Sequence, residues 1–226
     1  MSWTLKDCQI QIASEIDQSA TAPTEGGTDW LIRNNFINRS LIDWSNSYEW
    51  ESLKKIHNGI ISTSTGNASY ALPSDFKDID GFPQITADGS NTYGYPVDDP
   101  THNSRYLGTD RYVNILGNDT DSKVMYIHGG ALASGASVQF TYYSSPQSLA
   151  SANDIVPIPD PTYLVQRSLY YILKSREDGR FPEAKSESDR ILMRMIENEN
   201  TLGLSNVNRR VSVGPENYKT WRVGRD

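Results

Sequence analysis

The side chains that could build a metal centre are few and scattered. The chain contains three histidines, His57, His102 and His128, in different segments, and a single cysteine, Cys8. A structural or catalytic zinc site needs His and Cys ligands at short, characteristic spacings, and no such pair occurs in this sequence. We therefore expect the histidines at surface or strand positions, without a metal or a catalytic role.

Acidic residues could bind a cation or cleave a glycoside. Asp75, Asp78 and Asp80 alternate in a way that resembles a calcium loop, but such a loop also needs its glycine and its distal glutamate in register. We expect these three to be acids of a turn. The chain has 28 Asp and Glu residues, and the pattern singles out no two of them as a pair for glycoside hydrolysis.

A glycine-rich stretch at residues 129–135 could suggest a phosphate-binding loop. It lacks the Lys-Ser/Thr end of that loop and precedes an expected strand, so a hairpin connection explains it better. Ser134 within it is not in the Gly-x-Ser-x-Gly setting of a hydrolase nucleophile, and no base can be assigned to it. We expect a protein that is not an enzyme and that holds neither a cofactor nor a metal.

Residue types suited to binding gather at the C-terminal end. Residues 205–226 carry a net charge of +3, whereas the whole chain carries −7, which leaves −10 for the rest. Trp, Tyr and Arg dominate binding hot spots. We predict a tail that becomes ordered on a partner surface. Its expected contact residues are Arg209, Arg210, Tyr218, Trp221 and Arg222. The acidic remainder argues against a tight grip on nucleic acid, because phosphate binding needs excess Lys and Arg.

Helical periodicity occurs on both sides of the middle of the chain. Apolar residues recur on one face in an N-terminal helix and in a second helix capped by Asp29. Asp160 and Pro161 are a natural cap and first position for a third helix, and Pro182 begins a fourth. The apolar positions are Leu5, Cys8, Ile12 and Ile16, then Trp30, Ile37, Leu41, Trp44 and Tyr48, then Tyr163, Val165, Leu169, Ile172 and Leu173. We expect Trp30, Trp44 and Trp50 in the helical core.

The middle of the chain is rich in β signals. A hairpin is expected from Lys55–Thr65 into Ser69–Leu72, with Tyr70 and Leu72 pointing inward and Pro73 and Asp75 ending the strand. Further strands are expected at Arg111–Leu116, Lys123–His128 and Ser137–Tyr143. Residues 86–110 look like a long polar loop that is functional, disordered or ordered by a partner.

These elements predict an α+β fold in which a β-rich, sandwich- or barrel-like module is inserted into a small antiparallel bundle of about four helices. The expected parts are the N-terminal helices at 1–53, the inserted β domain at 54–153, the C-terminal helices at 154–202 and an extended docking arm at 203–226. Both ends of the insert should lie close together. The N-terminus lacks the pattern of a signal peptide, and no apolar run is long enough to span a bilayer, so we expect a cytoplasmic protein.

The order of these segments resembles the head–tail connector proteins of tailed bacteriophages, also called adaptor or head-completion proteins. The resemblance covers roughly residues 3–200. It is carried by the helix with Leu41-Ile-Asp-Trp44, by Trp50, and by the segment from Gly66 to Phe76. It continues with Val138–Tyr143, Ser-Ser-Pro146 and Asp154-Ile-Val-Pro-Ile-Pro159.

The resemblance implies a homo-oligomeric ring, commonly of twelve copies, that is mounted beneath the portal protein and extends the DNA channel towards a nozzle or tail-tube protein. DNA would pass through without specific binding, and no membrane would be involved. Such a protein is assembled in the host cytoplasm and belongs to the neck of the virion. Residues 205–226 would be the arm that docks on the portal, with the β domain facing the tail.

The alternative is a tail or baseplate component that binds a host-surface glycan, with Tyr93, Tyr95 and Tyr106 carrying the ligand. The same tyrosines could form the tail-facing loop of an adaptor. A third class, a cell-wall-cleaving enzyme, would need a matched pair of carboxylates.

Overall fold

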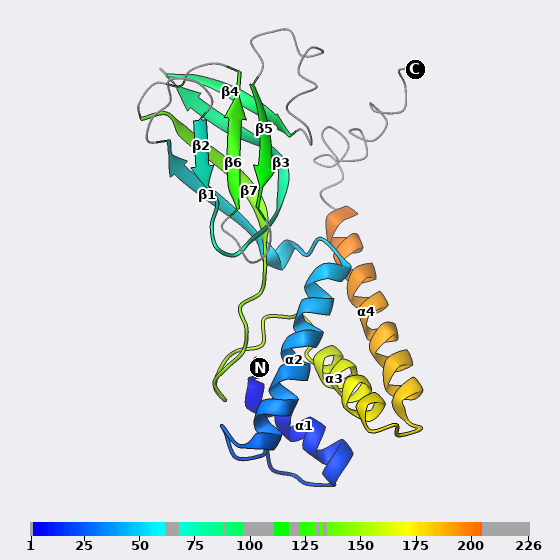
Figure 1. Ribbon diagram of the computed structural model, residues 1–226. Coiled ribbons are helices and arrows are strands. Elements are labelled where there is room, and N and C mark those ends of the chain that lie inside the picture. Colours follow the sequence, from blue (N-terminus) through cyan, green and yellow to red (C-terminus); the bar gives the residue numbers. More distant parts are fainter. Residues whose placement is uncertain are drawn as a thin grey trace. The chain divides into compact units, whose positions relative to one another are not determined.

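The computed structural model describes residues 2–61, 68–87, 89–96, 111–117, 123–129, 132 and 135–204, with residues 201–204 described as backbone only. The described residues form two compact units: residues 2–52 and 146–204 make up one, and the described residues between 53 and 145 make up the other (Figure 1). The chain was predicted to divide into four parts, with boundaries at residues 54, 154 and 203. Compactness does not show that a part folds by itself, so this division stays a proposal.

The helical unit contains four helices, and its arrangement corrects the predicted bundle. They are α1 (Leu5–Asp17), α2 (Thr28–Ser47), α3 (Thr162–Ser175) and α4 (Phe181–Leu204), with a short 3-10 turn η1 (Glu51–Leu53) after α2. An antiparallel bundle would pack α1 and α2 as a pair against α3 and α4. Instead α3 is the common partner and packs against α1, α2 and α4. The fold class is still α+β, but the small helical bundle is absent from the described residues.

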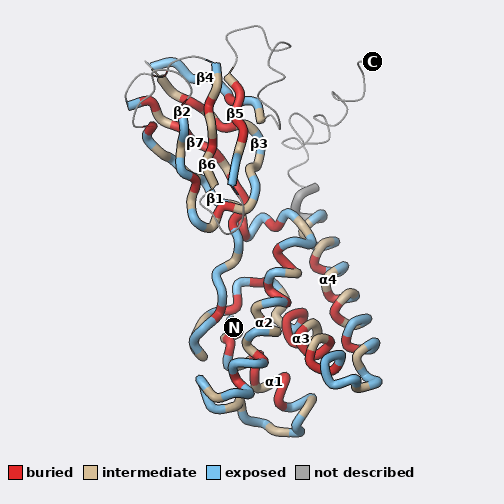
Figure 2. The backbone as a smooth tube through the Cα atoms, in the orientation of Figure 1, coloured by how far each residue is buried: buried red, intermediate tan, exposed pale blue. Residues whose placement is uncertain are grey.

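The central position of α3 follows from its burial on more than one side. The predicted face contained five apolar residues, and the helix also buries Leu164, Ser168 and Tyr170. A helix that is apolar around most of its circumference must be covered by several neighbours. Figure 2 shows the contrast: buried positions follow α3, whereas α4 is mostly exposed or intermediate.

Polar contacts connect α3 to two of its neighbours. Asp43 of α2 accepts a hydrogen bond from Nε of Arg167 at 3.0 Å and another from the hydroxyl of Tyr171. The Arg167 guanidinium also reaches Asp189 of α4 at 3.4 Å. One arginine of α3 therefore bridges acids from α2 and α4.

The predicted helix caps are partly correct. Pro161 is the N-cap residue of α3, and the carboxylate of Asp160, one residue earlier, accepts from the Thr162 N–H at 3.1 Å, so Asp160 does bind a free N–H of the first turn. The prediction for α2 was wrong: Gly27 is the N-cap, and Asp29 lies in the first turn, where its charge suits the positive end of the helix dipole.

The three tryptophans predicted for the helical core are buried, as expected. The rings of Trp44 and Trp50 stack with their centroids 5.0 Å apart. The Trp50 indole N–H donates to the carbonyl oxygen of Trp44 at 2.7 Å. This contact fixes the chain just after α2, before it enters the β unit.

The β unit is one curled, mixed sheet of seven strands that forms a half-barrel, in place of the predicted sandwich- or barrel-like module. The strand order is β1-β7-β3-β4-β5-β6-β2, and every neighbouring pair is antiparallel except β4 and β5. The strands are β1 (Lys54–Ile60), β2 (Ala68–Ala71), β3 (Phe76–Ala87), β4 (Ser90–Pro96), β5 (Arg111–Leu116), β6 (Val124–His128) and β7 (Ser137–Ser144). The register of β3 on β7 shifts between Asp80 and Gln84, and such a bulge bends a strand.

The predicted strands exist, but the predicted pairing of the first two was wrong. β1 pairs with β7, and β2 pairs with β6, so they form no hairpin with each other. β3 was not predicted, and β4 lies inside the segment expected to be a polar loop at 86–110. The alternation in β4 places Tyr and Thr beside Ser, Asn and Gly, so its apolar signal is weak.

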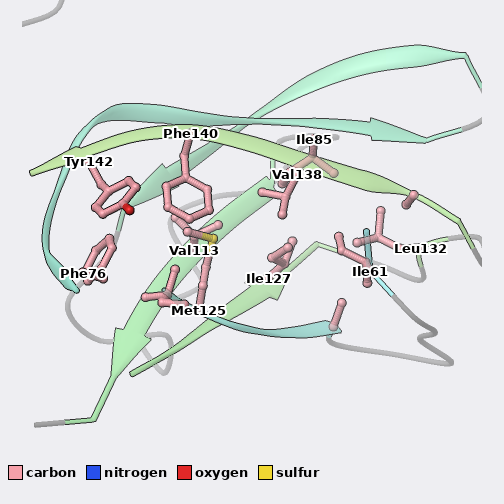
Figure 3. Packing of buried hydrophobic residues seen from close by; sticks show 13 residues of the cluster. Ile61, Phe76, Ile85, Val113, Met125, Ile127, Leu132, Val138, Phe140 and Tyr142 are labelled. Atoms are coloured by element: carbon pink, nitrogen blue, oxygen red, sulfur yellow. The ribbon is translucent and has the colours of Figure 1, made fainter. Parts of the chain in front are cut away.

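The concave side of the sheet holds the core of the β unit. Figure 3 shows side chains from both halves of the sheet, including Phe76, Val113, Met125 and Phe140, packed against one another. Leu72 belongs to this cluster and Tyr70 packs against it, which confirms that both point inward. Pro73 and Asp75 follow the end of β2, as predicted.

The two ends of the β unit are tied together. β1 and β7 are its first and last strands, and they are paired from Lys54 opposite Tyr143 onwards. The Ser144 hydroxyl donates to the carbonyl oxygen of Leu53 at 2.9 Å. The chain therefore enters and leaves this unit at neighbouring positions, as predicted.

Truncating a side chain of α3 tests the central role of this helix. Leu164→Ala should lower the free energy of unfolding by about 2–5 kcal/mol, because it removes a fully buried side chain. Met193→Ala is the matched control on α4, where the side chain is 57% exposed, and it should change stability by less than about 0.5 kcal/mol. Chemical denaturation measures both values. Equal effects would show that α3 is not central.

Candidate docking surfaces

The residues predicted to contact the portal lie outside the described residues. This applies to Arg209, Arg210, Tyr218, Trp221 and Arg222. Tyr106 of the predicted tail-facing loop lies outside them as well. The structure does place Tyr93 and Tyr95 on β4, in a strand rather than in a loop.

Tyr93 and Tyr95 form part of an aromatic surface on the convex side of the sheet. Tyr93 is 55% exposed and Tyr95 is 40% exposed. The ring of Phe82 from β3 lies against Tyr95, with centroids 5.2 Å apart at an angle of 58°. We call these three residues the aromatic patch. Large aromatic rings with one open face are well suited to protein contacts.

The strand pleat and a glycine decide which way these rings point. Successive residues of a strand face opposite sides, so Tyr93 and Tyr95 share the side opposite Gly94. Gly94 is buried, and a Cβ at this position would lie 2.7 Å from Cγ1 of Val113. The concave side has no room for a larger residue here, and the tyrosines therefore stay outside.

The edge strand β1 carries a second exposed surface. Ile56 is 70% exposed and Ile60 is 72% exposed. In the register of β1 on β7, His57 lies opposite Phe140 and Gly59 lies opposite Val138, and both partners point into the core. Residues of a strand alternate between its two sides, so Ile56 and Ile60 lie on the convex side. Exposed β-branched residues on an edge strand are open to contact with another chain. Phe82, Ile56 and Ile60 were not predicted as surface residues, although Ile56 and Ile60 are four residues apart and so share one side of a strand.

The three aspartates considered for cation binding are engaged within the protein. Asp75 accepts from Lys55 at 2.6 Å and from the Tyr142 hydroxyl at 2.9 Å. Asp80 pairs with Lys54 at 2.6 Å. Asp78 accepts from the N–H of Ile79 at 2.8 Å. Only Asp75 lies in a turn, so the prediction of turn acids was wrong for the two others, which belong to β3.

The Asp75 contact affects the ionisation of both partners. Burial alone would raise the pKa of Asp75, but hydrogen bonds from Lys55 and Tyr142 hold that pKa below its usual value. Burial and the nearby Asp75 carboxylate raise the pKa of Tyr142 to about 12. The pair stabilises the charged acid and the neutral phenol, and it links the β2–β3 turn to β7.

Two of the three histidines are described, and both lie in strands as expected. The Nε2 atom of His57 in β1 is 2.6 Å from the Tyr70 hydroxyl. The Nε2 atom of His128 in β6 is 2.7 Å from Oδ1 of Asn114. Across the part of the chain that the structure describes, no three His, Cys, Asp or Glu side chains gather as metal ligands. His102 lies outside it.

An α+β protein with exposed aromatic and aliphatic patches is typical of proteins that work by contact with other proteins. The chain belongs to the family described as SU10 adaptor protein, whose sequence pattern matches residues 3–213. This family of phage head–tail adaptors confirms the resemblance drawn from the sequence. Among curated proteins, none matches significantly. Of the described helices, none has the length and apolar character required to cross a membrane.

The depressed pKa of Asp75 predicts a pH-dependent contribution to stability. The charged carboxylate stabilises the fold at pH values above its unfolded pKa, near 3.8, and this contribution is lost as the pH falls through the lower folded value. Asp75→Asn should therefore be less stable than the natural protein at pH 7, and the difference should shrink as the pH falls below the unfolded pKa of 3.8. Urea unfolding at several pH values measures the difference. A difference that does not vary with pH would contradict the role of the charge.

Proposed function

We propose that the protein is a structural component of the virion that forms an adaptor ring between the portal and the tail and continues the DNA channel. The observation that carries this proposal is the family match, which extends over residues 3–213 and so includes both compact units. Each copy would contact its neighbours head to tail, so that the ring closes by rotation. Twelve copies is the number that we propose.

The charge distribution supports a conduit that does not hold DNA. Outside residues 205–226 the chain has a net charge of −10. A negative surface repels the phosphate backbone, so DNA can pass without being bound. The protein would perform no chemistry, and its site would be the neck of the virion, after assembly in the host cytoplasm.

The basic tail is the part that we propose to dock on the portal. Its charge of +3 is opposite in sign to that of the remaining chain. Arg209, Arg210 and Arg222 would meet acids of the portal, and Tyr218 and Trp221 would fill apolar pockets. A segment that orders only on its partner loses conformational entropy at that moment, so a few strong anchors must offset the cost.

Deleting residues 205–226 should abolish binding to the purified portal protein, and Trp221→Ala alone should weaken it by about 30-fold or more, as for a binding hot spot. Reversing Arg209 and Arg210 to Glu should weaken binding most at low salt, since exposed charges are screened as salt rises. Surface plasmon resonance with the full-length chain measures all three.

The matched control for charge is the double variant Lys6→Glu and Lys185→Glu. Both lysines are exposed on helices of the described part. The pair removes the same amount of positive charge without touching the tail, so portal affinity should change by less than about threefold. Unchanged binding after deletion of residues 205–226 would contradict the docking role.

The aromatic patch is the surface that we propose to face the next tail component. Tyr93→Ala and Tyr95→Ala should change the melting temperature little, because the two side chains are 55% and 40% exposed and lie outside the core. The double variant should still bind the portal but lose most of its affinity for the nozzle or tail-tube protein. Pull-down of each partner separately measures this. A variant that binds the tail component normally would remove the patch from the interface.

The alternative is that the same exposed rings bind a host-surface glycan, since sugars stack on open aromatic faces. The observation that favours it is the exposure of Tyr93 and Tyr95 beside Phe82. A glycan array distinguishes the two cases. Glycan binding that Tyr95→Ala removes, without portal binding by the natural protein, would support the alternative.

A further inference from the structure

The two edge strands of the sheet, β1 and β2, end the strand order on opposite sides. The curl of the sheet brings them towards each other, and in the described residues they share no backbone ladder. Every other neighbouring pair of strands is joined by backbone hydrogen bonds. We call the line between β1 and β2 the seam.

Among the described residues, the side chain of Tyr70 crosses the seam. Tyr70 of β2 points to the concave side, and its hydroxyl is 2.6 Å from Nε2 of His57 on β1. Its ring also meets Phe140 of β7 edge-on, with centroids 6.4 Å apart. Tyr70 therefore contacts both strands on the far side of the seam.

Gly59 provides the space that Tyr70 occupies. A Cβ at position 59 would lie 2.0 Å from the Tyr70 hydroxyl oxygen and 2.2 Å from the ring carbon that carries it. Any side chain here would collide with the ring. The glycine in β1 and the tyrosine in β2 are thus complementary, although glycine in a strand interior weakens the strand.

We propose that Tyr70 is a latch that holds the seam closed, and that the β unit opens locally at this seam while the rest of the sheet stays paired. Among the described residues, the seam is bridged by the Tyr70–His57 hydrogen bond, by the Tyr70 ring and by the core packing beneath it, whereas each other strand boundary is in addition a ladder of backbone bonds. Local opening follows the boundary that costs least to separate. Opening would let the sheet change its curl without breaking a ladder.

The burial pattern shows what opening would uncover. Ala68 on β2 and Ile61 after β1 are both almost fully buried and belong to the core cluster of the β unit. Val113 lies in the same cluster but on β5, which has ladders on both sides. A probe at position 68 therefore reports on the seam, and a probe at position 113 reports on unfolding of the whole unit.

Thiol labelling of the full-length chain tests the latch. Ala68→Cys and Val113→Cys are made separately, and the rate of modification by a small thiol reagent is measured under native conditions. The thiol at position 68 should react at least about tenfold faster than the thiol at position 113, because local opening needs less free energy than global unfolding. The natural Cys8, buried in the helical unit, is an internal control for each protein.

Variants of the latch complete the test. Tyr70→Phe removes the hydrogen bond and should speed labelling at position 68 about fivefold, with labelling at position 113 unchanged. Gly59→Ala should speed it further by displacing the ring, and Tyr95→Phe, a tyrosine far from the seam in strand order, should have no effect. Should Gly59→Ala fail to fold, His57→Asn gives the second measurement. Equal labelling rates at positions 68 and 113, or equal acceleration of both by Tyr70→Phe, would overturn the proposal.

Discussion

The pairing of β1 with β7 is the contact on which the architecture of this protein depends. These strands are the first and last of the β unit, and they run antiparallel from Lys54 opposite Tyr143. The chain can therefore leave the helical unit after α2 and return before α3 without separating those two helices. On the return, the Asn38 side chain of α2 holds Leu149 by two hydrogen bonds, one to its carbonyl at 2.9 Å and one from its N–H at 2.8 Å. The Asn38 amide therefore binds both the C=O and the N–H of Leu149, as the backbone of a paired strand would, and this fixes the position of the chain there.

The two units differ in how they bury apolar surface. The helical unit encloses one central helix, α3, and connects it to α2 and α4 through Arg167. The β unit curls one sheet around a core, so its convex side is free for contacts, and there Tyr93, Tyr95, Ile56 and Ile60 stay exposed.

Several elements were predictable because their pattern is local. The apolar positions of α1 and α2 repeat with a helical period, and residues 138–143 of β7 alternate with a period of two, so the type of these elements was correct. The turn after β2 followed from Pro73 and Asp75. The candidate surfaces were harder to predict. Tyr93 and Tyr95 were named, but as residues of a loop. Phe82 was missed because its contact, Tyr95, belongs to another strand. The tail residues were chosen from the chemistry of their side chains alone, and they lie outside the described residues.

The sequence by itself determined the type of the helices and of every strand except β3 and β4, the charge contrast between the tail and the remaining chain, and the resemblance to phage adaptors that the family match confirms. The tertiary structure alone decided that β1 joins β7 rather than β2, that α3 is central, and that Tyr70 fills the space above Gly59. The reason is physical. A period along the chain reports the local backbone conformation, whereas strand order and helix position depend on contacts between residues far apart in sequence, which no local pattern records.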